Sequence, residues 1–514
     1  MSTKWDTVVI GAGIGGLSAA ARLVQDGLRV LILEKSCHPG GTAYVYTRKG
    51  FTFPMGPLGF STPNLVRHAL TDLDQGPDLL FSRVHYLVKA FGVEVPISLP
   101  FDQMKDELAR RFPHDRIGIN GFFNDMDKTL SALENPSAGS NRSALDKAET
   151  IPAQAFLKGL IGDWRLRRIV GSLGTHEPYS GLPLLAAMWG QMSKEGIWYP
   201  DGGMRAFCDR LTRAATGSGE HGKGYGKIRL GAEVKKIRLS RGRALGVTLA
   251  DGLEIDTAAI VSNADYKATF MRLIDPQFLQ RRWLEAVKRA KLTNSVFQVC
   301  LGIDTRKVDL SAFSGASRLI FKQTAPGDDR ELSMNWLAEN LNPASIAAQE
   351  MEISLWSKED PKLAPHGSAV IVIRTEADHG HFLKYRPEPG KRIPAYHSFK
   401  IRLGQALISQ AEQLVPGLEK AIQVFDVATP LTFEERAGRT EGAVAGWSWD
   451  FEDNPNQSME LVRTPISGLY MAGYQAYSAL FMGGVPTALS SGLRAAESLL
   501  GGAEPIEQFR LPGD

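Results

Sequence analysis

This sequence has few cysteines, no long apolar run and no large excess of one charge. Its three cysteines, Cys37, Cys208 and Cys300, are scattered without CxxC spacing, so neither a disulfide framework nor a zinc site is indicated and a reducing cytosol fits. No apolar run reaches the roughly 18 residues that cross a bilayer, and no signal-peptide hydrophobic region precedes the first predicted strand. The net charge of +3 is too small to indicate a nucleic-acid partner. These absences predict a cytoplasmic protein that is soluble or, at most, peripheral at the inner face of a membrane.

The first forty-odd residues carry the most specific motif. Residues 7–10 read as a strand, Gly11-Ala12-Gly13-Ile14-Gly15-Gly16 follows, and an Ala/Leu-rich helix leads to a second strand, 29–33, that ends on Glu34. In such a motif the first glycine allows a tight turn, the second lets backbone approach a pyrophosphate, and the last lets the helix pack close to the strand. The helix start offers free N–H groups to phosphates, and the acid accepts hydrogen bonds from a ribose. This order predicts a dinucleotide site; an ordinary glycine-rich turn is the alternative.

The stretch after Glu34 favours FAD over NAD. It runs Lys35-Ser36-Cys37-His38-Pro39-Gly40-Gly41-Thr42, with no immediate return to a helix. A Gly-Gly pair at this point lets the backbone pass under a longer cofactor toward its flavin end. Spacing alone leaves a plain turn at Pro39-Gly40-Gly41 open as the alternative.

The C-terminal part of the chain supplies a second glycine-rich connection. Residues 468–473 read as a short strand that ends in glycine, and Gly483-Gly484-Val485-Pro486 leads into a helix over 488–500. Proline suits the first turn of a helix, and the positive end of the helix dipole stabilises negative charge. Reduced flavin carries such charge near its N1–C2=O edge, so this helix suits a hydride-accepting flavin; a generic strand-to-helix connection is the alternative.

Between these ends, 514 residues of which 43% are hydrophobic allow a large core and two or three domains. Residues 156–173 predict one apolar helix, and 228–255 predict an antiparallel meander followed by a buried strand, 258–261. A meander before a returning parallel strand is typical of a Rossmann-type FAD domain that is interrupted and resumed. Residues 281–291 predict a basic amphipathic helix. Two interpretations are open: the helix lies on a membrane surface, or its charged residues only form a solvated face. No third ligand accompanies His379-Gly380-His381, so no metal site is predicted.

Taken together, these segments resemble the bacterial phytoene desaturase, carotenoid isomerase and retinol saturase family of FAD-dependent oxidoreductases, which are relatives of the flavin amine oxidases. The matching segments are 9–27, 33–42, 50–53 with Gly56, 199–204, 260–265, 360–367 and 468–496. The resemblance implies non-covalent FAD, a backbone contact to adenine near Val234, and a flavin floor formed by Gly473 and the Gly484-Val485 helix start. The full set of implied cofactor residues is Gly11, Gly13, Ile14, Gly15, Gly16, Glu34, Lys35, Gly41, Thr42, Val234, Gly473, Gly484 and Val485.

The resemblance also implies an α/β fold in which a two-dinucleotide-binding FAD domain is interleaved with an α+β substrate domain. The expected FAD domain comprises 1–70, 197–265 and 424–505. The expected substrate or membrane-facing domain comprises 71–196 and 266–423. Family members act on long apolar polyenes or isoprenoids, commonly at a membrane surface, so an apolar small-molecule substrate is expected here.

Two departures from the family leave the substrate open. Pro54 stands where the family usually has an aspartate, and Ala479-Leu480-Phe481-Met482-Gly483-Gly484 replaces a more polar run, which predicts a more apolar pocket. The expected pocket residues are Met55, Tyr474, Phe481 and Met482. The expected reaction is hydride transfer between a substrate C–H and flavin N5, making, saturating or isomerising a C=C bond.

No spacing identifies an acid–base pair, and no catalytic residue is assigned. Arg48, His176, Glu177 and Tyr474 are available, but each of these types is more often structural. An oxidase of amines or other small molecules and a non-catalytic FAD-binding scaffold remain the alternatives, and the electron acceptor or donor is open.

Overall fold

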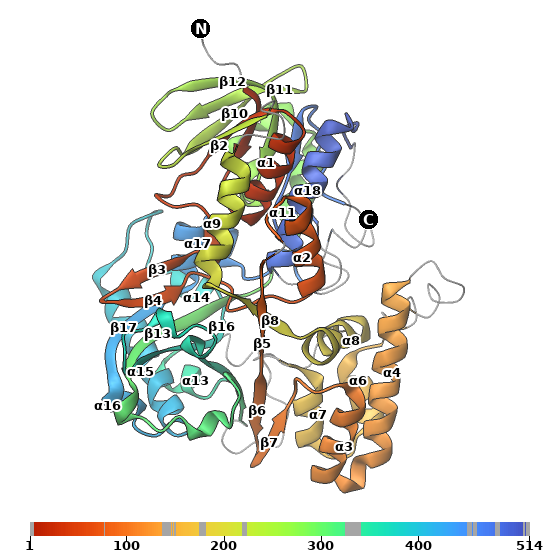
Figure 1. Cartoon of the computed structure of the whole chain (residues 1–514), viewed down its shortest axis with the longest axis vertical. Helices are drawn as coiled ribbons and strands as arrows, with labels where there is room; N and C mark the ends of the chain where they lie inside the picture. The colour runs from red at the N-terminus through yellow and green to blue at the C-terminus, as the bar shows by residue number, and fades with distance from the viewer. Residues whose placement is uncertain are drawn as a thin grey trace.

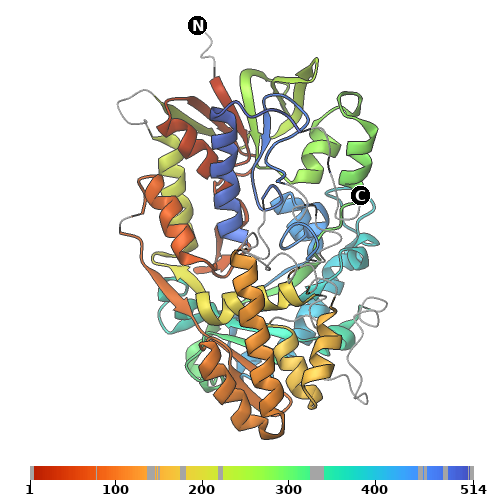
Figure 2. The same ribbon diagram turned by 90° about the vertical axis from the view of Figure 1, so that its right-hand side faces the viewer.

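The structure is a computed structural model, and it describes residues 5–76, 78–135, 145, 148, 151–173, 181–217, 224–323, 341–449, 455, 460–477, 484–506 and 509. Within these ranges the chain forms two seven-stranded sheets and a group of helices. Figure 1 shows the first sheet at the N-terminal end of the molecule and the second sheet below it. The helical group, drawn in orange, lies at the far end from the N-terminus in both Figure 1 and Figure 2.

The first sheet is built around β1 (Trp5–Ile10), which pairs in parallel with β12 on one side and β2 on the other. Val8 and Val9 are fully buried because helices and loops cover both faces, as in other parallel sheets. The strand order is β10-β11-β12-β1-β2-β9, with β18 added beside β12. The other strands are β2 (Arg29–Leu33), β9 (Tyr225–Arg229), β10 (Val234–Ser240), β11 (Arg243–Leu249), β12 (Glu254–Ser262) and β18 (Leu469–Met471).

Strand β12 joins the meander to the parallel sheet. Its first half is antiparallel to β11, where Gly246 pairs with Asp256, and its second half is parallel to β1, where Val8 pairs with Ile260. Ile260 also pairs with Leu469 of β18, so the C-terminal strand enters the same sheet. The predicted meander and returning strand are therefore confirmed. The last strand of the meander and the returning strand are one continuous strand, β12, rather than two.

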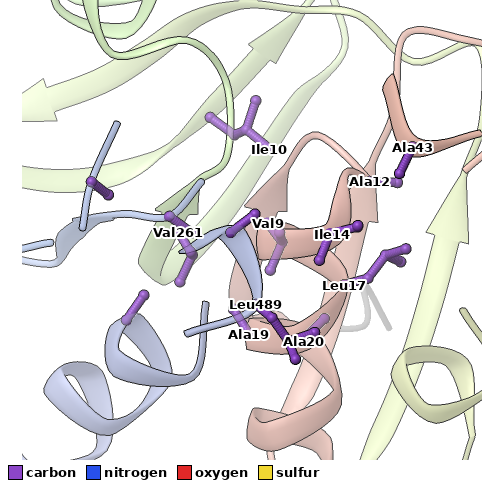
Figure 3. Close-up of a cluster of buried hydrophobic side chains, with 14 of the residues drawn as sticks. Val9, Ile10, Ala12, Ile14, Leu17, Ala19, Ala20, Ala43, Val261 and Leu489 are labelled. Atoms are coloured by element: carbon purple, nitrogen blue, oxygen red, sulfur yellow. The ribbon is translucent and has the colours of Figure 1, made fainter. Parts of the chain in front are cut away.

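Three helices pack along this sheet: α1 (Ile14–Gln25), α9 (Gly203–Thr216) and α18 (Gly484–Leu500). Small residues allow α1 and α18 to approach closely, since a Cβ on Gly492 would lie 2.1 Å from Ser18 Oγ. Ser18 Oγ donates to the Leu489 carbonyl at 3.2 Å. Figure 3 shows Leu489 of α18 beside Ala19 and Ala20 of α1, in the core beneath the turn that follows β1.

The second sheet has the order β17-β13-β16-β15-β14-β6-β7 and is antiparallel except where β14 runs parallel to β6. Helix α15 (Pro394–Glu412) packs on it through Phe399, Leu403 and Leu407. Two short hairpin strands, β3 (Val45–Arg48) and β4 (Phe51–Pro54), link it to the first sheet. The strands are β6 (Tyr86–Ala90), β7 (Val93–Pro96), β13 (Ser295–Asp304), β14 (Arg318–Lys322), β15 (Met351–Leu355), β16 (Ser368–Ala377) and β17 (Ile422–Ala428).

The helical group has an aromatic core in which Phe101, Phe122 and Phe123 surround Trp189. Trp189 is fully buried, and its indole N–H donates to the Val170 carbonyl at 2.9 Å. Its helices are α3 (Phe101–Arg111), α4 (Arg116–Glu134), α6 (Ala153–Leu160), α7 (Trp164–Gly171) and α8 (Leu182–Trp189). Short strands β5 (Phe81–Val84) and β8 (Ile197–Pro200) connect the group to the rest of the chain.

The single helix predicted over 156–173 is wrong: the chain forms α6 and α7 with a break between them. Asp115 causes the break, because its carboxylate accepts the N–H groups of Gly162 at 2.6 Å and Asp163 at 3.0 Å. The Asp163 side chain then caps α7 by accepting from Arg165 N. These bonds replace the helical bonds that those groups would otherwise make.

The predicted domain division stays a prediction, and two features cut across its boundaries. Strand β17 contains the boundary at 423/424, yet it pairs along its length with β13 of the second sheet. Helix α11 (Arg281–Arg289) falls in the expected substrate domain, yet its buried Trp283 packs on Phe270 and Phe509 in the core of the first sheet. Because protein covers the apolar side of α11, a membrane role for that side is excluded. Among the helices described, none is long and apolar enough to cross a membrane.

Candidate active site

A cavity of about 400 Å³ lies where the first sheet meets the second. Its wall includes the turn after β1, the end of β2 and the start of α18, together with Val296 of β13 and Arg374 of β16. Ligands of open parallel sheets bind at this edge, outside the carboxyl ends of the strands. The predicted residues that line the cavity are Gly11, Gly13, Ile14, Gly15, Glu34, Lys35, Gly41, Thr42, Met55, Val234, Gly473, Tyr474, Gly484 and Val485.

Two glycine-containing loops lie against each other at one wall. Gly11 has a φ of +89°, which favours glycine, and its N–H donates to the Leu33 carbonyl at 2.8 Å. Gly40 N donates to the Ala12 carbonyl at 2.7 Å, which joins the 40–42 loop to the turn. A Cβ on Gly41 would lie 3.1 Å from Gly13 Cα, so a side chain at position 41 would fill the gap between the loops, whereas a Cβ on Gly13 would first meet the Asn263 side chain.

Of the predicted cofactor residues, Gly16 does not line the cavity. A Cβ at this position would lie 2.1 Å from the Gly11 carbonyl oxygen and 3.2 Å from Val9 Cγ1. Gly16 therefore allows α1 to pack closely on β1, which is the role that the motif assigns to its last glycine.

Glu34 is held at the end of β2 with its carboxylate facing the turn. One oxygen accepts from Ala12 N at 2.7 Å and the other from Ser36 N at 2.8 Å, and the residue is only 6% exposed. Each carboxylate oxygen can accept more than one hydrogen bond, so both keep capacity for hydroxyl donors from the cavity.

Asn263 was not predicted as a site residue, yet it lies at the centre of the glycine positions. It follows β12, and its N–H donates to the Ile10 carbonyl at 2.8 Å. Its side-chain amide lies 2.6 Å from where a Cβ on Gly13 or on Gly15 would stand. In the sequence, Asn263 lies only within the segment 260–265 that follows the buried strand. Nothing in that segment indicates a contact with the turn after β1.

Comparison with known proteins places this geometry in a family. The model of the family described as "Flavin containing amine oxidoreductase" matches residues 14–359, which is more than half of the chain. The chain belongs to this family. FAD is therefore its cofactor, and the protein is a flavin-dependent oxidoreductase.

Individual relatives and structures agree with this family. The chain is 26% identical to a chloroplastic prolycopene isomerase of Daucus carota, over 92% of this chain and 76% of that protein. It is also 26% identical to a neurosporene-forming phytoene desaturase of Cereibacter sphaeroides, over 84% of this chain and 82% of that protein. The fold resembles that of an oxidoreductase from Methanosarcina mazei, with a TM-score of 0.62 and 19% identity over 95% of this chain and 99% of that one.

The residues present fit the flavin cofactor of this family. A side chain at position 41 would fill the space between the two glycine loops, so this cradle offers backbone to a diphosphate. The carboxylate of Glu34 lies at the end of β2, where such motifs bind a ribose. Gly484 and Val485 both line the cavity, so the start of α18 borders it. Of the two, Val485 is buried and Gly484 is exposed.

Two arginines that sequence reasoning missed also line the cavity. Arg439 comes from the loop after α17 (Pro430–Ala437), and Arg374 comes from β16. Arg374 donates to Gln298 Oε1 at 2.7 Å and to the Gly56 carbonyl, so it fastens the loop after β4 to the second sheet. Burial lowers the pKa of its guanidinium. Neither arginine belongs to a recognisable motif.

Tyr474 borders the cavity directly after Gly473. Burial raises the pKa of its phenol above the ordinary value, and its buried hydroxyl has no hydrogen-bond partner among the described residues. Its ring lies 4.6 Å from the guanidinium carbon of Arg439. The structure thus brings Tyr474 to the cavity, where a bound molecule can supply the missing partner.

Two of the features named from the sequence, Arg48 and the His379-Gly380-His381 segment, do not join the site. Arg48 pairs with Asp426 at 3.2 Å and is half exposed, outside the cavity lining. His379 bonds to Glu434 at 2.7 Å, and the described residues hold no cluster of metal ligands. His176, Glu177, Phe481 and Met482 lie outside the described residues.

Proposed function

We propose that this protein desaturates, saturates or isomerises C=C bonds of an apolar polyene or isoprenoid-type substrate. Two relatives with similarity over most of the chain, named as a prolycopene isomerase and a phytoene desaturase, support this substrate class. FAD supplies the chemistry by exchanging a hydride with a substrate C–H at flavin N5. The protein contributes binding, orientation and exclusion of water.

Each wall of the cavity has a part in this proposal. The glycine loops at Gly13 and Gly41 hold the diphosphate of FAD, Glu34 holds a ribose, and the backbone at Val234 contacts adenine. Gly473 and the first turn of α18 form the flavin floor. We keep 1–70, 197–265 and 424–505 as the proposed FAD domain and the rest as the substrate domain, except that β17 belongs to the second sheet and α11 packs in the core of the first.

The character of the remaining wall is the observation that carries the proposal. The second sheet and the loop after β4 contribute Val296, Met55 and Pro57, which are apolar. Asp265, an acid that lines the cavity, accepts from Ala268 N, Thr440 N and Thr440 Oγ1, so its carboxylate is already occupied. A wall that presents these apolar side chains, and whose acid Asp265 is already hydrogen-bonded, suits hydride transfer to or from a hydrocarbon.

An amine oxidase reaction is the alternative, because the matched family is named for it. Arg374 lines the same wall, but Glu352 is its register partner on β15 and acts on its charge, so this arginine alone does not distinguish a neutral substrate from an ammonium group. The support for a hydrocarbon therefore comes from the two named relatives and from the apolar residues of the wall. A non-catalytic FAD-binding scaffold is the third possibility, and reduction of the flavin by any donor excludes it.

Product mass distinguishes the three reactions on the hydrocarbon. The purified protein is incubated with a carotenoid extract in liposomes, and the products are analysed by mass spectrometry. Loss of two hydrogens identifies a desaturase, gain of two a saturase, and an unchanged mass with a changed absorption spectrum an isomerase. Dependence of turnover on liposomes would support association with a membrane surface. Conversion of an amine with no change in any polyene would refute the proposal.

A further inference from the structure

Arg439 is fixed in place by four contacts from three parts of the chain. Nη1 donates to the carbonyls of Ala443 at 3.1 Å and Val444 at 2.7 Å, and Nη2 donates to Thr42 Oγ1 at 2.8 Å. The ring of Tyr474 lies 4.6 Å from the guanidinium carbon. The position of this cation is therefore determined before any ligand binds.

Arg439 makes no ion pair with a carboxylate in the described part of the chain, although Asp265 accepts two hydrogen bonds from the adjacent Thr440. All of the hydrogen-bond acceptors of Arg439 there are neutral: two carbonyls and one hydroxyl. A guanidinium has five N–H groups, so donors remain after these three bonds. A partly buried cation that is held only by neutral groups at the wall of a cavity is suited to an anionic ligand.

The location of Arg439 identifies which anion it can reach. Its partner Thr42 directly follows Gly41, where a Cβ would touch Gly13 Cα, so the guanidinium stands beside the two glycine loops. These loops present backbone to the diphosphate in the proposed cofactor site. Backbone N–H groups provide hydrogen bonds but no full charge, and Arg439 supplies a full charge next to them.

We propose that Arg439 binds the diphosphate of FAD and closes the phosphate site from the side opposite the glycine turn. This inference rests on the placement of FAD given under the proposed function. It makes Arg439 a cofactor-binding residue from a segment outside residues 14–359, the range matched by the family model. Tyr474 and the two carbonyls act as positioning groups, since they fix the guanidinium plane.

Two of the three other arginines that line the cavity provide the comparison. Arg436 and Arg272 are exposed, and neither makes a hydrogen bond or ion pair within the described residues. A general attraction of the cavity for anions would depend on all four arginines, Arg374 included. A specific diphosphate contact depends on Arg439 alone, so Arg436→Met is a matched control three residues away.

The test is displacement of FAD from the holoenzyme by ADP and by adenosine, followed by the rise in flavin fluorescence. ADP carries the diphosphate and adenosine does not. FAD itself carries the diphosphate, so Arg439→Met should weaken FAD and ADP alike. Displacement by ADP is therefore expected to stay unchanged, and adenosine is expected to displace FAD about 10- to 100-fold more effectively, which corresponds to the loss of a charge-assisted contact. Arg439→Lys keeps the charge but not the fixed fork of donors, so an intermediate gain for adenosine is expected. Arg436→Met is expected to leave both ligands unchanged.

Several results would overturn the inference. These are an equal change for ADP and adenosine in Arg439→Met, no change for either, or an equal effect of Arg436→Met. The wild-type protein provides a test that needs no variant: added salt should weaken FAD and ADP alike, and so should make adenosine a more effective displacing ligand relative to ADP. ADP that is no better than adenosine, with no difference in salt dependence, also overturns it. No polyene takes part in this test, so failure of the proposed reaction would be seen separately.

Discussion

Gly13→Val separates loss of the cofactor from loss of the fold. Gly13 has φ −72° and ψ 175°, a conformation that any residue adopts, so valine brings no backbone strain. The nearest atom to its new Cβ is Asn263 Nδ2 at 2.6 Å, at the end of a side chain that can move, and the next is 3.7 Å away. We therefore expect overpacking to cost only about 1–2 kcal/mol of the free energy of unfolding.

The effect on FAD is expected to be much larger, because Gly13 lines the cavity at the position where the motif lets bare backbone approach a diphosphate. The assay is the ratio of absorbance at the flavin band to that of protein after gel filtration, combined with thermal unfolding. We expect a folded, colourless variant whose melting temperature is lowered by a few degrees. Gly159→Ala is the control, since nothing lies within 4 Å of its Cβ in helix α6. A yellow Gly13→Val protein with wild-type FAD content would refute the placement of the cofactor.

Three further predictions concern single side chains. Glu34→Gln places an amide donor against the N–H of Ala12 or Ser36. We therefore expect a loss of about 1–3 kcal/mol in the free energy of unfolding and weaker FAD retention, measured by melting with and without added FAD. An unchanged melting temperature would contradict this. Glu350→Gln removes the buried carboxylate that binds both Arg168 and Lys322. Denaturant unfolding should show a loss of about 3–5 kcal/mol in the free energy of unfolding. A loss below about 1 kcal/mol would show that these three side chains are not coupled. Burial raises the pKa of the Cys208 thiol to about 12 and that of Cys300 to about 11. A thiol reagent at neutral pH should therefore label only the exposed Cys37 until denaturant is added. Labelling of two thiols in the folded protein would be inconsistent with this burial.

Features encoded by consecutive residues could be predicted from the sequence. The turn after β1, the acid at the end of β2 and the strand–glycine–helix order at the C-terminus all depend on local spacing, and the structure brings these segments to one cavity. The meander was predicted for the same reason, since alternation of apolar residues is a property of each strand by itself.

Features created by distant contacts could not be predicted. The break between α6 and α7 depends on Asp115, which lies 47 residues before Gly162 in the chain. Arg439 reaches Thr42 across 397 residues, and Arg374 reaches Gly56 across 318. Neither arginine has a spacing that marks it, and only the packing of the second sheet and the loop after α17 against the glycine loops reveals them.

The most direct test of the proposed function is the anaerobic flavin spectrum of the purified protein mixed with a carotenoid extract, recorded from the oxidised and from the dithionite-reduced state. The proposal predicts that the polyene bleaches the oxidised flavin band, or that the reduced protein converts the polyene, with or without return of that band. If the polyene neither changes the spectrum nor is converted in either state, while an amine bleaches the oxidised band, the proposed substrate class is wrong.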